Sequence, residues 1–238
     1  MDAVGGVAGD MLAGALLDLG WPLAELQDLT GRLGLAGVKV EEVRVQHHCI
    51  SARRILVHVE SDQPHRRLPQ VQEALEGLPP EVAAAALRVF QRLAEAEAQV
   101  HGCAPEEVHF HEVGAADALV DVTAFCGGLA WLGWPRLISS PLPLGRGFVR
   151  AAHGELPLPA PAVLHLLKGA PVTDWPEPGE TVTPTGAALV TTLAQGWGQV
   201  PSMRLMTHGT GGGSRPSGAR PGLLRLLLGE VVAGQSVS

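Results

Sequence analysis

The residue types best suited to chemistry gather in one short stretch of the chain. His109, His111 and Glu112 lie within four residues, and Asp117 and Asp121 follow within the next nine. In an extended segment the two histidines would project to one face, and the two aspartates, four apart, would share one face of a helix. Imidazole and carboxylate ligands suit nickel, zinc, iron(II) or manganese, whereas the imidazoles disfavour calcium. The stretch therefore predicts a divalent-metal site.

The same residues also have an interpretation that involves no metal. Histidines can satisfy backbone groups, and aspartates favour the first turn of a helix. His65 and His153 could complete a metal site, although each taken singly is more typical of a surface or structural histidine. The spacing alone leaves both interpretations open.

A second candidate site lies at the start of another predicted helix. Thr183 can cap this helix, and Pro184 fits its first position. The exposed N–H groups near Thr185 and Gly186 would then suit an anion such as a phosphate or a carboxylate. A purely structural cap has the same sequence, so this signal is also ambiguous.

Other reactive motifs are absent from the sequence. The glycine-rich turn at residues 5–10 and the glycine-rich loop expected at residues 209–213 do not continue into the Gly-Lys-Ser/Thr of a P-loop. There is no Gly-x-Ser-x-Gly motif, and Cys49, Cys103 and Cys126 lack an obvious neighbouring base. The remaining functions that the sequence supports are metal chemistry and binding.

Composition narrows the class of protein. The 238 residues are 46% hydrophobic and 17% charged, which is enough apolar material for a core. A net charge of −7 without a strong basic run argues against nucleic acid as a partner. No apolar run reaches the roughly 18 residues of a membrane helix, and the first residues lack the basic region of a signal peptide. Three widely spaced cysteines without a Cys-x-x-Cys pair favour a cytoplasmic location.

Hydrophobic periodicity predicts the helices. Apolar residues repeat with helical spacing over residues 82–93 and 118–129, and Gly102 is expected to end the first of these helices. Shorter helices are expected after the turn at residues 5–10, ending near Gly20, and from Pro22, Pro161 and Pro184.

Alternating patterns predict the strands. The valines of residues 38–45, interrupted at Glu41 and Glu42, predict a strand with a bulge, and residues 55–59 predict its antiparallel partner in a hairpin. Residues 223–228 predict a further strand. The expected fold is mixed α/β (α+β), with helices packed on a mixed sheet. We expect a small N-terminal α/β lobe at residues 1–62, which carries the hairpin, and a main α/β lobe with the metal site at residues 63–238; the two could form one continuous domain.

Several motifs occur together and in order along the chain. They are Gly-Val-Ala-Gly-Asp-Met at residues 6–11, the segments 90–98, 140–145 and 147–149, Val-His-Phe-His-Glu-Val-Gly at 108–114, Ala-His-Gly at 152–154, Pro-Ala-Pro-Ala at 159–162 and Thr-Pro-Thr-Gly-Ala-Ala-Leu at 183–189. In this combination the chain resembles the LarC-type nickel-insertion proteins of nickel-pincer nucleotide cofactor biosynthesis.

The resemblance implies an activity and roles for individual residues. Family members install nickel in pyridinium-3,5-bisthiocarboxylic acid mononucleotide through two nickel–sulfur bonds and one nickel–carbon bond. The reaction is that of a metal insertase of the lyase class, depends on CTP with a metal ion such as Mg²⁺ or Mn²⁺, and serves lactate racemase-type enzymes. The implied nickel ligands are His109, His111, Glu112, Asp117, Asp121 and His65; His153 or Glu112 would accept the ring proton; and Thr183, Thr185 and Gly186, with Arg146 or Arg66, would hold the substrate phosphate.

The resemblance also implies partners. Full-length members continue with a C-terminal part linked to the cytidine nucleotide, and some members are split into two polypeptides, so a separate C-terminal polypeptide is a candidate partner. A homo-oligomer is a further candidate, and the sequence leaves the oligomeric state open. Two other functions fit the residues alone. One is a nickel-binding chaperone or storage module without catalysis, and the other is a divalent-metal-dependent hydrolase that activates water.

Overall fold

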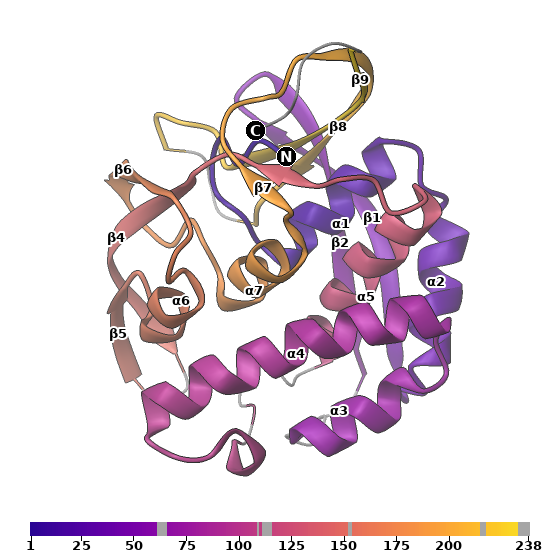
Figure 1. The fold of residues 1–238 in the computed structure, drawn as a ribbon, viewed down its shortest axis with the longest axis vertical. Coiled ribbons are helices and arrows are strands. Elements are labelled where there is room, and N and C mark those ends of the chain that lie inside the picture. Colours follow the sequence, from indigo (N-terminus) through magenta and orange to yellow (C-terminus); the bar gives the residue numbers. More distant parts are fainter. Residues whose placement is uncertain (61–65, 109, 111–115, 152–153, 215–217, 233–238) are drawn as a thin grey trace.

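The computed structural model describes residues 1–60, 66–108, 110, 116–151, 154–214 and 218–232. It confirms the mixed α/β class, because helices pack on sheets that contain both parallel and antiparallel strand pairs (Figure 1). Three sheets are present in the described part of the chain, and the largest has the strand order β1-β2-β8-β9.

The N-terminal hairpin forms one half of the largest sheet. Strand β1 (Val38–His47) pairs with β2 (Ile50–Val59) in antiparallel register, as the sequence predicts. The predicted bulge is wrong, because the register runs without a shift along the whole pair. The interruption of the valine pattern has a different cause. Glu42 takes a position on the same face as Val40 and pairs there with Arg53 of β2.

The other half of this sheet comes from the end of the chain. Strand β8 (Met203–Gly212) joins β2 in parallel orientation, and β9 (Leu223–Val231) pairs with β8 antiparallel. Strand β9 confirms the strand predicted at residues 223–228. The glycine-rich loop expected at residues 209–213 is wrong for its first four residues, which lie in β8. The sheet thus unites residues from both sides of the boundary expected near residue 62.

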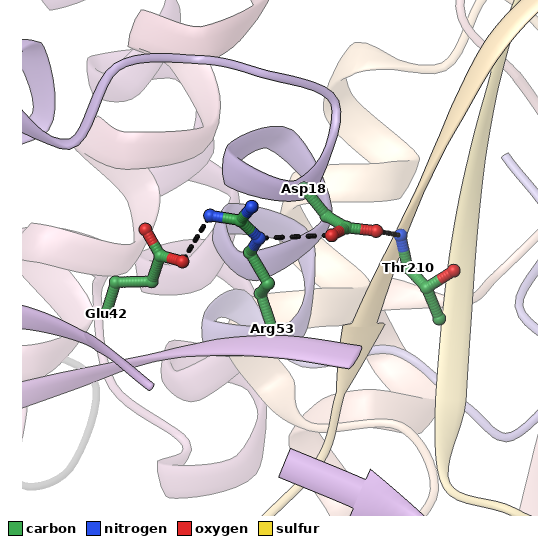
Figure 2. Close-up of polar contacts among 4 residues, drawn as sticks. All are labelled: Asp18, Glu42, Arg53 and Thr210. Carbon is green, nitrogen blue, oxygen red and sulfur yellow. Dashed lines mark hydrogen bonds and ion pairs between the residues drawn. The ribbon is translucent and has the colours of Figure 1, made fainter. Parts of the chain in front are cut away.

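Helix α1 (Gly9–Asp18) explains why β8 is rich in glycine. A Cβ atom at Gly211 would lie 1.8 Å from the Met11 carbonyl oxygen, so the strand can approach the helix backbone only without a side chain there. Figure 2 shows a polar link at the other end of this contact. Arg53 donates to Asp18 (3.0 Å) and to Glu42, while Asp18 accepts from the Thr210 N–H (2.9 Å).

The remaining long helices build the core beside this sheet. Helix α4 (Pro80–His101) ends at Gly102, whose φ of +67° gives the expected left-handed cap, and α5 (Ala116–Trp131) is buried along most of its length. Both confirm the predicted amphipathic helices. Shorter helices α2 (Leu23–Arg32), α3 (Leu68–Leu75) and the 3₁₀ turn η1 (Pro105–Glu107) complete this layer, with α3 beside α4 (Figure 1).

A smaller sheet follows α5 in the chain. Strands β4 (Leu142–Ala151), β5 (Gly154–Leu158) and β6 (Val172–Pro178) have the order β5-β4-β6, and β3 (Ile138–Ser139) pairs with β7 (Gly196–Trp197) in a separate two-stranded sheet. Helices α6 (Pro161–Leu166) and α7 (Pro184–Leu193) begin at the predicted prolines. No helix in the described residues is both long enough and apolar enough to cross a membrane.

Candidate functional site

The glycine-rich turn before α1 and the start of α7 are neighbours in space. The Val7 N–H donates to the Thr181 carbonyl oxygen (2.7 Å), and the Thr183 N–H donates to the Val7 carbonyl oxygen (3.1 Å). Gly186 packs on the same turn, because a Cβ atom there would lie 2.4 Å from the Val7 oxygen. Two segments that the sequence offers as separate candidates therefore form one structural unit.

The cap of α7 has the structural role that its sequence allows. The Thr183 hydroxyl accepts a hydrogen bond from the Gly186 N–H (3.1 Å), so one donor of the helix end is already used. The hydroxyl of Thr181 donates to the Pro143 carbonyl oxygen (2.5 Å) and accepts from the Gly145 N–H (2.8 Å), which ties the approach to α7 onto β4. The turn is therefore held rigidly next to α1.

A polar cavity of 330 Å³ opens beside this unit. Its walls come from the turn before α1 with the first residues of this helix, the end of β6 with the segment that leads to α7, and residues 213–214 and 218–222. The charged residues of its described lining are Asp10, Glu177, Glu180 and Arg220. Within this described lining the acidic side chains outnumber the basic one, which favours a cation.

The Arg220 guanidinium, from the described lining of the cavity, packs against a neighbouring ring. It lies 5.4 Å from the ring centroid of Trp175. The Glu177 carboxylate accepts from the backbone N–H groups of Ala219 (3.1 Å) and Arg220 (2.9 Å), so it anchors this wall of the cavity. Glu177 therefore has a structural role in this wall. Asp10 and Glu180 supply the other carboxylates of the described lining.

Asp10 also connects the cavity to helix α5. A Cβ atom at Gly9 would lie 2.4 Å from a carboxylate oxygen of Asp121, so the start of α1 touches this side chain directly. Burial raises the pKa of Asp121 well above its ordinary value, and the charges of Asp10 and then Asp117 raise it further, against a backbone hydrogen bond from Asp10. The two aspartates predicted on α5 thus lie beside a third acidic residue from a distant part of the chain.

Asp10 has its own perturbed environment. Burial raises its pKa, while the hydrogen bond from the Met11 N–H (2.9 Å) and the charge of Arg54 act in the opposite direction. Asp10 is not among the site residues predicted from the sequence. Its available signal was the Gly-Asp pair at the first turn of a helix, directly after the glycine-rich segment.

The predicted histidine cluster lies outside the described residues. This holds for His109, His111, Glu112, His65 and His153, which stay predictions. Within the described part of the chain, no group of three or more His, Cys, Asp or Glu side chains is arranged to hold a metal ion.

The residue between the two histidines is described. Phe110 is buried with its ring centroid 6.3 Å from that of Phe90 on α4, and its N–H donates to the Arg66 carbonyl oxygen (3.1 Å). Burial lowers the pKa of the Arg66 guanidinium. Arg66 therefore contacts Phe110, the residue that separates His109 and His111 in the sequence.

The predicted phosphate-binding residues do not all face the polar cavity. Thr183 lines it, whereas Thr185, Gly186, Arg146 and Arg66 are not among its described lining residues. The Arg146 guanidinium is exposed on β4 and donates to the Pro176 carbonyl oxygen. Their role in binding a phosphate stays a prediction.

Cys126, the buried cysteine of α5, lies in an environment that disfavours its thiolate form. Burial raises the pKa of the Cys126 thiol on α5 to about 12, so this group stays protonated at neutral pH.

Comparison with known proteins decides the family. A family model described as "Nickel insertion protein" matches residues 1–237. The chain belongs to the nickel insertion protein family. Three similar relatives carry the name "Putative nickel insertion protein". They come from Geobacter sp. strain M21 (45% identity over 237 residues, 98% of this chain and 62% of the relative), Citrifermentans bemidjiense (46% over 232 residues, 96% and 60%) and Syntrophobacter fumaroxidans (43% over 235 residues, 98% and 60%).

The match leaves part of each of these nickel insertion relatives uncovered. The chain spans about 60% of the length of the curated relatives that it matches. No solved structure matches the chain.

Proposed function

We propose that the chain binds nickel and takes part in its insertion into pyridinium-3,5-bisthiocarboxylic acid mononucleotide, which yields the nickel-pincer cofactor of lactate racemase-type enzymes. The observation that carries the proposal is the contact between the start of α1 and Asp121. It joins the lining of the negative cavity to helix α5, whose sequence follows directly on the predicted ligands His109, His111 and Glu112.

Nickel is cargo in this proposal, so its ligands must be replaceable. The two sulfurs of the dithio nucleotide have to displace protein ligands, and imidazoles and carboxylates release nickel more readily than a closed thiolate cage would. Asp10 and Asp121 suit this task. Burial raises the pKa of both carboxyl groups, so a nearby cation would stabilise their ionised forms. Asp117, exposed at the start of α5, would extend the same acidic path.

Formation of the nickel–carbon bond releases one proton from the pyridinium ring. In the proposal His153 or Glu112 accepts this proton as a general base. The substrate phosphate would rest at the start of α7 near Thr183, Thr185 and Gly186, with Arg146 or Arg66 as its cationic partner.

The described lining of the cavity gives CTP little support. Among the described lining residues, a triphosphate would meet the carboxylates of Asp10, Glu177 and Glu180, with Arg220 as its cationic partner. We therefore assign CTP, with its Mg²⁺ or Mn²⁺, to the part of the relatives that this chain does not cover, supplied as a separate polypeptide or as a continuation.

The test is reconstitution with purified chain, nickel, the dithio nucleotide and CTP, with and without the remaining region of a relative. The nickel-containing nucleotide, detected by mass spectrometry, is expected when both parts are present. If no metallated product forms in any mixture, insertion by this chain is excluded. Retained nickel without product would favour the chaperone or storage function, and metal-dependent hydrolysis of the nucleotide would favour the hydrolase.

A further inference from the structure

An apolar groove of 570 Å³ lies apart from the polar cavity and shares no lining residue with it. We call it the terminal groove, because its described lining includes Met1 and Val231. The other walls come from the end of α5, the segment that leads into β3, the segment before β8, and β9. Most of its lining side chains are aliphatic, among them Leu132, Ile138, Val200, Met203 and Leu227.

Apolar side chains at this groove are exposed to solvent. Val200 and Val231, which both line the groove, are 54% and 59% exposed. Asp2, Arg136 and Gln199 give the groove a polar margin. A contiguous apolar hollow with polar residues at its edge is typical of a surface that another polypeptide covers.

The positions of Met1 and of the last described strand point to the occupant. Met1 is held in the groove wall, where its amino group donates to the Ile138 carbonyl oxygen (2.6 Å) and its carbonyl oxygen accepts from the Ser140 N–H (3.0 Å). Val231, at the end of β9, lines the same groove. More than a third of the relative from Geobacter sp. strain M21 lies outside the part that matches this chain. Residues joined before Met1 would therefore leave from this groove, and the last described strand of the chain ends beside it.

We propose that the terminal groove is the docking surface for the region that the longer relatives carry outside the matched part. A region tethered at the edge of the groove has a high effective concentration there, which favours it over a second copy of the chain. The proposal rests on the groove and the lengths of the relatives, and it does not depend on nickel.

The test fuses the uncovered region of the Geobacter sp. strain M21 relative to this chain, at the end where it occurs in that relative. Amide hydrogen exchange is then compared with that of the chain alone. Docking is expected to slow exchange in the groove segments 198–203 and 226–231 by ~tenfold or more, because covered amides open less often. Unchanged exchange in both segments of the fused protein would overturn the proposal.

Two matched substitutions separate docking from a general change in stability. Val200→Glu places a charge in the groove and is expected to return exchange to the rate of the chain alone. Val172→Glu, at a valine that is 47% exposed and outside the groove, is expected to leave the protection unchanged. Equal effects of the two substitutions would contradict docking in the groove. Protection that appears in the chain alone and grows with its concentration would assign the groove to a second copy.

Discussion

The polar cavity and the terminal groove differ in the chemistry of their walls. The cavity has a volume of 330 Å³, and carboxylates of Asp10, Glu177 and Glu180 dominate its charge. The groove has a volume of 570 Å³ and mainly aliphatic walls. A negative hollow attracts a divalent cation, whereas an aliphatic hollow gains by leaving water. This difference underlies our two proposals, that one hollow takes part in handling the ion and the other receives a polypeptide.

The largest effect is expected from the predicted ligands of the ion. His109→Ala combined with His111→Ala should abolish tight nickel binding, a loss beyond the ~100-fold that removal of an outer-shell partner can cause. Isothermal titration calorimetry measures it, and circular dichroism checks that the fold is kept. Val200→Glu, in the groove, should bind nickel as the unchanged chain does. If the histidine variant keeps the same nickel stoichiometry, the ligands lie elsewhere.

A single methyl group should disturb the contact between α1 and α5. In Gly9→Ala the new Cβ would lie 2.4 Å from the Asp121 carboxylate, which overpacks the site and should lower the free energy of unfolding by about 1–3 kcal/mol. Gly31→Ala is the matched control, since nothing lies within 4 Å of a Cβ there and α2 should gain up to about 1 kcal/mol. Urea denaturation measures both changes. Equal stability of the two variants would show that the contact is loose.

Removal of the Asp10 charge should weaken nickel binding without unfolding the chain. Asp10→Asn keeps the shape of the side chain, and we expect about tenfold weaker binding because the aspartate acts beside the ligands. Asp28→Asn, on the exposed face of α2, serves as the control with the same chemical change. Nickel titrations of the two variants at equal ionic strength give the comparison. An unaltered dissociation constant for Asp10→Asn would remove the cavity from the nickel path.

The smallest effect concerns the dependence of stability on pH. The folded-state pKa values of Asp10 and Asp121 are raised, so folding favours their protonated forms. Their contribution to stability is therefore full at low pH and decreases as pH rises above the ordinary carboxyl range of about 4 towards the raised values. Asp121→Asn should make this decrease shallower. Urea denaturation of the metal-free chain at several pH values checks the slope, and an identical slope in the variant would contradict the raised pKa of Asp121.

Local patterns predicted much of the fold. The apolar spacing of α4 and α5, the prolines that begin α6 and α7, and the hairpin of β1 and β2 all act over a few residues, so the sequence displays them directly. The cap at Thr183 is of the same kind, because its partner Gly186 is three residues away.

Patterns that depend on distant partners misled the sequence analysis. The slip at Glu42 resembled a bulge because its partner Arg53 lies on the neighbouring strand. The glycines of β8 resembled a loop because the α1 backbone that requires them is nearly 200 residues earlier. For the same reason the sequence did not identify Asp10 as a site residue, since its neighbour Asp121 lies on another helix.

The sequence by itself determined the local elements, the family motifs and the kinds of side chain available to bind a divalent metal. Only the tertiary structure decided that Asp10 and Thr183 line one negative cavity, that Asp10 and Asp121 are neighbours, and that Met1 and Val231 line one apolar groove. The physical reason is range. Helical spacing, caps and turns depend on neighbours within a few residues, whereas charge coupling and the shape of a hollow depend on which distant segments pack together.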